Sequence, residues 1–168
     1  MKKFLFLMLI SFLACSGAYA QSLGKMTLGC KRYDIPLSLP SGFNVNTTNT
    51  ENQLTYTTKQ GNENVSFYLE NGVVHKITMH KFIDSGRDIN RIKSKLEEVI
   101  LSLYEAWGEP SYIGENIYWQ FPTSKATLTY NVSTLQLDDP LRYSGHSSVT
   151  TYRCYMDIKL EKRTNIFE

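Results

Sequence analysis

The chain has 168 residues, of which 42% are apolar and 20% charged, and its formal net charge at pH 7 is +2. This length fits one domain, and the apolar content is too high for a disordered chain. A net charge so close to zero argues against nucleic-acid binding and against attachment to a membrane through a basic patch, since both depend on clustered positive charge.

Residues 1–20 have the pattern of a secretory signal peptide. Two lysines precede an apolar stretch, and the small residues Ala18 and Ala20 form a cleavage pattern after it. Its removal would leave a single globular domain over residues 21–168, with 16 basic and 16 acidic residues. We therefore expect an exported protein, periplasmic or extracellular, with a formally neutral mature chain.

Cys15 raises the alternative of a lipoprotein anchored in the cell envelope. It follows Phe12, Leu13 and Ala14, and only Ala14 suits the sequence that precedes a lipidated cysteine. We therefore favour a released protein over an anchored one. The apolar stretch of the leader is shorter than the roughly 20 residues that cross a bilayer, so no transmembrane span is expected.

The first half of the chain reads as strands and turns. Pro36 and Pro40 bracket a short extended segment, and Asn, Thr, Ser and Gly dominate residues 41–52, which predicts a polar, mobile loop. Alternating apolar residues predict strands at about 26–33, 53–59, 65–69 and 73–81.

The turn at Asn71-Gly72 allows two loop lengths. A two-residue loop would put the apolar side chains of the two strands on opposite faces. A three-residue loop over 70–72 pairs Leu69 with Val73 and Phe67 with His75, which gives one apolar face. We predict the three-residue loop.

The clearest helix is predicted over residues 86–107. Apolar residues recur there at three- and four-residue steps, Ser85 can cap the helix with Asp88 in the capping-box position, and Gly108 ends it. Strands follow at 116–121, 125–132 and 152–160, with a long loop over 133–148. This order predicts an α+β fold, an antiparallel β-meander sheet packed on one amphipathic helix in two layers.

The helix end Trp107-Gly108-Glu109-Pro110, followed by a strand that holds Trp119, resembles the small periplasmic domains of the β-lactamase-inhibitor-like type. Those domains usually place two helices before the sheet, whereas strands come first here. The resemblance covers a small part of the chain and implies no function for it.

Cys30 and Cys154 are the two cysteines outside the leader and its Cys15. In an oxidising compartment an even pair most simply forms a disulfide, and Cys154 lies on the apolar face of the strand 152–160. We predict this bond, with two separate buried thiols as the alternative. A catalytic thiol is disfavoured because the chain has no Cys-x-x-Cys motif.

The loop 133–148 is the candidate binding loop, because connections of this length are uncommon in compact domains unless they are functional or disordered. The loop contains serine, histidine and aspartate residues, which are the types of a catalytic triad, but the chain has no Gly-x-Ser-x-Gly motif that would hold a nucleophilic serine. Recognition, or a plain connection, is therefore favoured over catalysis. The loop's candidate binding residues are Asp138, Asp139, Arg142, Tyr143 and His146.

Tyr33, Tyr118 and Tyr155 fall on the polar sides of their predicted elements and are candidate exposed aromatics for a protein or glycan partner. His75 and His80 are five residues apart on one strand, which places them on opposite faces. No metal site is expected, and no phosphate or dinucleotide motif predicts a cofactor.

Taken together, these features favour an exported, non-enzymatic binding module for a protein or envelope component, and an inhibitor is the most specific form of this hypothesis. The alternatives are a small secreted hydrolase that uses His146 with Asp138 or Asp139 and a serine of the 133–148 loop, and a membrane-anchored lipoprotein.

Overall fold

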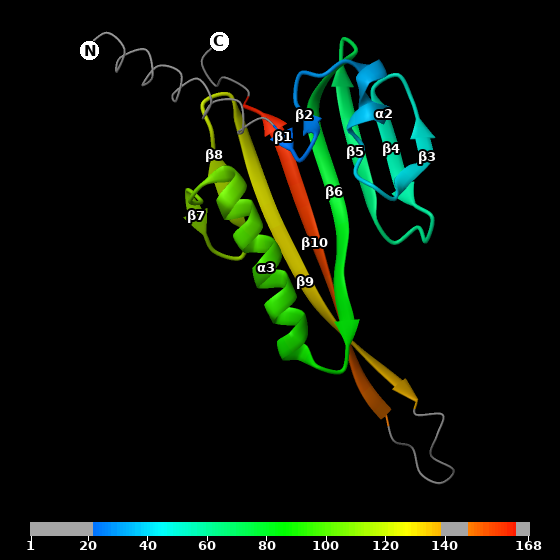
Figure 1. The fold of residues 1–168 in the computed structure, drawn as a ribbon, viewed down its shortest axis with the longest axis vertical. Coiled ribbons are helices and arrows are strands. Elements are labelled where there is room, and N and C mark those ends of the chain that lie inside the picture. The colour runs from blue at the N-terminus through cyan, green and yellow to red at the C-terminus, as the bar shows by residue number, and fades with distance from the viewer. Residues whose placement is uncertain (1–21, 139–147, 164–168) are drawn as a thin grey trace, which may run out of the picture.

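The computed structural model describes residues 22–138 and 148–163. An eight-stranded antiparallel sheet forms one layer, and the long helix α3 (Ile89–Trp107) lies across one of its faces (Figure 1). The predicted two-layer α+β fold is confirmed. The strands of this sheet are β3 (Phe43–Asn49), β4 (Gln53–Thr58), β5 (Asn64–Glu70), β6 (Val73–Gly86), β7 (Tyr112–Ile113), β8 (Ile117–Gln120), β9 (Ser124–Asp138) and β10 (Ser148–Lys162).

The sheet joins two four-stranded meanders. Its strand order is β3-β4-β5-β6-β10-β9-β8-β7, so that each meander runs from an outer edge to the centre, where β6 pairs with β10. Helix α3 leaves the end of β6 and carries the chain across β10, β9 and β8 to the far edge (Figure 1). The last described strand therefore lies in the middle of the sheet.

A small N-terminal layer lies on the same face as α3. It consists of β1 (Ser22–Leu23), β2 (Met26–Thr27), the 3-10 helix η1 (Arg32–Asp34) and α2 (Ile35–Ser38). The strand predicted at 26–33 is therefore mostly wrong, and so is the extended segment between the prolines. Pro36 lies in the first turn of α2, where its missing N–H costs nothing, and Ile35 is fully buried.

Residues 43–49 form the edge strand β3, which corrects the prediction of a mobile loop over 41–52. The ladder with β4 contains two irregularities, and polar Asn and Thr side chains occupy most of the strand. Bulges and polar residues are common on strand edges, because they discourage pairing with other chains. Arg32 secures the loop after β3 by donating to the carbonyls of Thr50 and Glu51 at 2.8 and 2.7 Å.

The β5–β6 hairpin has a two-residue loop, so the predicted three-residue loop is wrong. Glu70 pairs with Val73, and Asn71 and Gly72 between them have φ values of 52° and 75°. Positive φ at both central residues is the requirement of a type I′ turn, which an Asn-Gly pair meets with little strain.

A β-bulge at His75 restores the single apolar face that the longer loop was expected to provide. The ladder shifts by one residue there, so that Phe67 pairs with Ile77 and Val65 with Met79, and His75 is not the partner of Phe67. An extra residue on one strand reverses the inward and outward alternation beyond it. The hairpin thus combines the favoured turn with a common buried face.

Asp88 caps α3 directly, because its side chain accepts hydrogen bonds from the backbone N–H groups of Asn90 and Arg91 at 2.9 and 3.2 Å. The helix therefore begins later than predicted, and Ser85 is not its cap. Gly108 ends it at a φ of 80°, as expected. The apolar stripe of α3 packs on the sheet through Ile92, Leu96, Leu103 and Trp107.

Candidate functional site

Strands β9 and β10 extend beyond the rest of the sheet as a two-stranded ribbon. They pair along their whole length, from Ser124 with Lys162 to Asp138 with Ser148. The ladder between β10 and β6 ends at Tyr152, opposite Gly86. Residues 135–138 and 148–151, which we name the hairpin arm, therefore pair only with each other among the described strands and project past the ends of α3 and β6 (Figure 1).

Strands β9 and β10 include residues 133–138 and 148 of the predicted 133–148 loop, which corrects the loop at both of its ends. Leu135 alternates with Thr134 and Gln136, and this period-two pattern was the signal that the strand continues. Of the candidate binding residues, Asp138 belongs to the end of β9 by its backbone, opposite Ser148. Asp139, Arg142, Tyr143 and His146 lie outside the described residues, between the two strands of the arm.

The three candidate tyrosines do not form one surface. Tyr33 is 70% exposed on η1, and Tyr118 is 37% exposed on β8, at the opposite edge of the sheet, with the Tyr112 ring 5.9 Å away. Tyr155 is half-buried in the central strand β10. Different elements separate these three rings, which the sequence pattern did not show.

A polar and aromatic cluster lies on the sheet face opposite α3. His80 of β6 approaches Asp157 of β10, with 2.8 Å between Nδ1 and Oδ1. The His80 ring stacks on Tyr155 at 5.0 Å between centroids, and Phe82 contacts the same tyrosine at 5.5 Å. Asp157 and Tyr155 alternate with the buried residue Met156, which places them on the outer face.

Sequence reasoning missed this cluster because His80 and Asp157 are 77 residues apart. A histidine oriented by a carboxylate is one part of a general-base system, and such a system also needs a nucleophile within hydrogen-bond reach of the imidazole. In residues 22–138 and 148–163, the hydrogen bonds of His80 include none to a serine, threonine or cysteine side chain. The same part of the chain contains no group of three metal-ligating side chains.

The expected disulfide between Cys30 and Cys154 is absent, and both residues are free thiols. The backbone of Cys30 accepts a hydrogen bond from Val74 at 3.0 Å, whereas Cys154 pairs with Asp84. Val74 and Asp84 are ten positions apart on β6, which corresponds to about 30 Å at the rise of a β-strand. A disulfide needs Cα atoms within about 7 Å of each other.

Burial raises the pKa of both thiols, and the nearby charge of Asp84 raises the pKa of Cys154 further. Cys154 is fully buried between Ile92 and Leu96. A thiol that stays protonated and out of contact with solvent is a poor nucleophile. Cys154 therefore acts as a small apolar core residue.

No protein-family model matches this chain, and no curated protein was found to match it. None of the helices within residues 22–138 and 148–163 is long and apolar enough to cross a membrane. The expected signal peptide, with Cys15, lies outside the described residues.

Proposed function

We propose that this protein is an exported, non-enzymatic binding module that engages a protein or another envelope component through its hairpin arm. The support for this proposal is the arm itself. Two strands of 15 residues each are longer than usual for globular domains, and their ends extend past the layer that α3 covers.

The geometry of the arm suits insertion into a partner's cleft. A two-stranded ribbon is much narrower than the body of the domain, so it can reach positions that the body cannot. The arm also carries at its end the segment with Asp139, Arg142, Tyr143 and His146, which combines both charges with aromatic rings. Aromatic and arginine side chains are the residue types that most often dominate binding energy at interfaces.

The open edges of the arm provide a second mode of contact. Strand β8 pairs with β9 only as far as Leu128, so the β9 backbone beyond this position faces no described strand on that side. An unpaired strand edge can add a strand from a partner through main-chain hydrogen bonds. An inhibitor that blocks an enzyme's active site is the most specific form of this proposal.

Site-specific photo-crosslinking in the producing cell tests the proposal. A benzoylphenylalanine placed at Gln136, an exposed arm residue, should cross-link to a defined partner, and one placed at Asn62, exposed in the β4–β5 turn, should not. A shortened variant, in which Asn-Gly replaces residues 135–151, should lose the partner while it keeps a cooperative thermal transition.

Two results would overturn the proposal. The first is a set of cross-linked products that is the same from Gln136 and from Asn62. The second is full retention of the partner by a folded shortened variant.

A further inference from the structure

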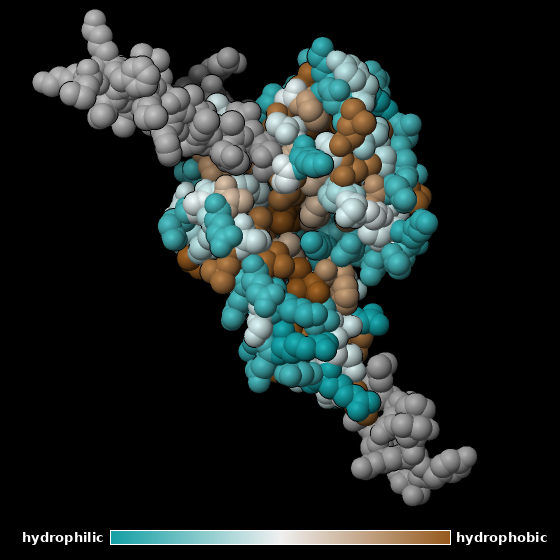
Figure 2. All heavy atoms as spheres, in the orientation of Figure 1, coloured by the Kyte–Doolittle hydropathy of each residue, from teal (hydrophilic) through white to brown (hydrophobic). Residues whose placement is uncertain are grey.

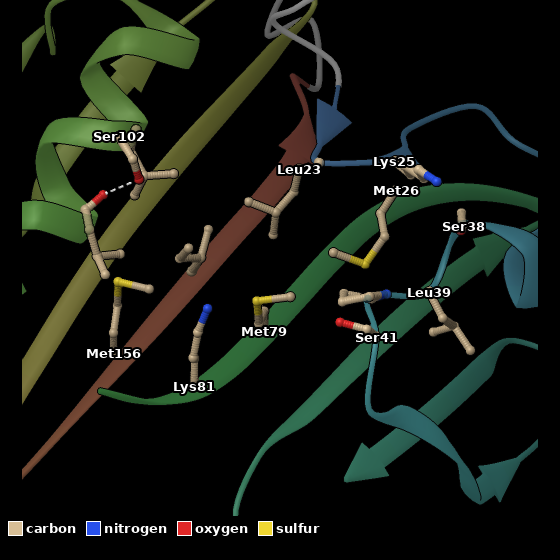
Figure 3. Close-up of a pocket in the computed structure, with 15 residues that line it drawn as sticks. Leu23, Lys25, Met26, Ser38, Leu39, Ser41, Met79, Lys81, Ser102 and Met156 are labelled. Atoms are coloured by element: carbon tan, nitrogen blue, oxygen red, sulfur yellow. Dashed lines mark hydrogen bonds between the residues drawn. The ribbon is translucent and has the colours of Figure 1, made fainter. Parts of the chain in front are cut away.

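A cavity of about 540 Å³ lies between α3 and the N-terminal layer, above β6 and β10. Met79 and Met156 lie at its floor, Leu103 comes from α3, and Leu23 and Met26 come from β1 and β2 (Figure 3). In the space-filling view, apolar side chains are visible in the hollow between the helix and the N-terminal layer (Figure 2). The volume is within the range of about 300–1,000 Å³ that is typical of small-molecule sites.

Methionine is concentrated at this cavity. The chain has five methionines, and the three that follow the predicted signal peptide, Met26, Met79 and Met156, all line it. Methionine side chains are unbranched and polarizable, so they adapt to flexible apolar ligands better than branched side chains do. This composition favours a ligand with a flexible hydrocarbon chain over one with a rigid ring system.

The charged groups of the cavity are both positive. Lys25 and Lys81 line it on opposite sides, Lys81 rises from β6 between Met79 and Met156 (Figure 3), and no acidic residue is among the lining residues. Both lysines are exposed, and neither forms an ion pair with another described residue.

Ser38, Ser41 and Ser102 supply the hydroxyl groups of the cavity lining, and two of the three donate to carbonyl groups of the chain itself. Ser38 and Ser102 donate to the carbonyls of Ile35 and Val99, three residues earlier, at 2.8 and 2.7 Å. The ammonium groups of the lysines are therefore the strongest polar groups that the cavity offers to a ligand. An apolar floor below two cations is complementary to a ligand with a hydrocarbon chain and an anionic head.

We propose that this cavity binds a single-chain anionic amphiphile, specifically a free fatty acid. Its hydrocarbon chain would lie on Met79, Met156 and Ile158, and its carboxylate would interact with Lys81 and Lys25. A protein partner fits less well, because stable protein interfaces are broad surfaces that bury at least about 1,200 Å² in total, whereas this site is a hollow confined between α3 and the N-terminal layer. This ligand site is separate from the hairpin arm and does not depend on the function proposed for the arm.

Isothermal titration calorimetry of the purified, delipidated protein tests this inference. The probe is sodium dodecanoate below its critical micelle concentration, and the comparison ligand is dodecyltrimethylammonium, which has the same chain length and the opposite charge. We expect one dodecanoate per protein molecule and weaker binding of the cationic ligand, since the cavity repels a positive head group.

Three substitutions locate the binding site. Lys81→Gln and Lys25→Gln should each weaken dodecanoate binding by roughly 3- to 10-fold, because each removes one charge-assisted contact at an exposed position. Ser102→Trp should fill the cavity and weaken binding further. Lys93→Gln, at an exposed lysine of α3 outside the cavity lining, is the matched control and should leave binding unchanged.

The inference is overturned if the folded protein does not bind dodecanoate, or if it binds the two amphiphiles equally well. An unchanged affinity in Lys81→Gln and Lys25→Gln would overturn it too, whether or not Ser102→Trp folds. Retention of dodecanoate binding in the shortened-arm variant is expected, because the two sites are independent.

Discussion

Oδ2 of Asp84 lies 3.1 Å from Nζ of Lys95, and this contact joins the end of β6 to the first half of α3. Arg91 of the same helix adds a second cation at 3.2 Å, and the Asp84 side chain is only 14% exposed. Burial opposes ionisation of Asp84. The ion pair with Lys95, the backbone N–H of Ser85, which donates to Oδ1 at 2.8 Å, and the charge of Arg91 outweigh this effect and hold the pKa of the carboxyl below its usual value. The ionised form therefore stabilises the docking of α3.

Replacing Asp84 with asparagine should lower the free energy of unfolding at pH 7 by about 1–2 kcal/mol, a value between those of exposed and buried ion pairs. Because the folded-state pKa is lower than that of the unfolded chain, the stabilisation is fully present above the usual carboxyl pKa of about 4 and is lost as the pH falls below it. Urea denaturation at pH 7 and at pH 3 should show a smaller difference between wild type and variant at the lower pH.

Glu98→Gln is the control for this experiment, because Glu98 is an exposed carboxylate on the same helix. It should change the free energy of unfolding by less than about 0.5 kcal/mol. Equal effects of Asp84→Asn and Glu98→Gln at pH 7 would contradict a specific role of the Asp84 ion pairs.

The free state of the two cysteines predicts unequal effects of their replacement. Cys154→Ser should cost about 1–3 kcal/mol, since it places a hydroxyl among Ile92, Leu96 and Val132. Cys30→Ser should cost less, because Cys30 is only half-buried. Intact-mass measurement of the purified protein before and after reduction should show no gain of two hydrogens. A gain of two hydrogens, or equal losses of stability in the two variants, would restore the disulfide hypothesis.

The bulge in β6 predicts which single-residue deletion the hairpin tolerates. Without His75, Val74 and Lys76 become neighbours, and their present partners Leu69 and Tyr68 already follow one another in a regular ladder. Deletion of His75 should therefore cost less than about 1.5 kcal/mol. Deletion of Thr78, which lies in the regular part of the ladder, inverts the faces of the residues beyond it and should abolish cooperative unfolding. Circular dichroism melts of the two deletion variants check this, and the opposite ranking would contradict the register.

Trp119 links the end of α3 to the sheet. It is 1% exposed, its Nε1 donates to the carbonyl of Gly108 at 2.9 Å, and its ring meets that of Trp107 at 5.3 Å. Trp119→Phe should lower the free energy of unfolding by about 1–3 kcal/mol through lost volume and a lost hydrogen bond.

Trp107 is then the only remaining tryptophan, so its fluorescence follows the urea transition of the variant. Tyr118→Phe, on the exposed side of the same strand, should change stability little, and an equal loss would argue against this role of Trp119.

Local patterns were sufficient to predict most elements of the fold. Alternation identified the strands at 53–59 and 152–160, and the spacing of Ile92, Leu96 and Leu103 identified the helix, because burial of one face imposes a period on consecutive residues. Segments without a strong period were assigned wrongly. The mostly polar residues 43–49 form a strand because β4 supplies hydrogen-bond partners for their backbone. This pairing cannot be predicted from the local sequence pattern.

The site was less accessible to sequence reasoning than the fold. The pairing of His80 with Asp157 depends on β10 lying next to β6, and that arrangement depends on contacts between residues far apart in the chain. The same holds for the cavity, whose lining residues come from β1, β2, β6, α3 and β10. The disulfide prediction failed for this reason too. Two cysteines in the sequence suggest a bond between Cys30 and Cys154, but the sequence does not show how far apart these residues lie in the fold.

The central place of β10 makes folding dependent on the end of the described chain. Until residues 148–162 have been synthesised, β6 and β9 lack the strand that joins their two meanders, and neither half has a complete sheet. Pairings between segments so far apart in sequence form slowly, because a long loop must close before they contribute. The complete eight-stranded sheet therefore forms only after synthesis has reached Lys162, the last residue of β10.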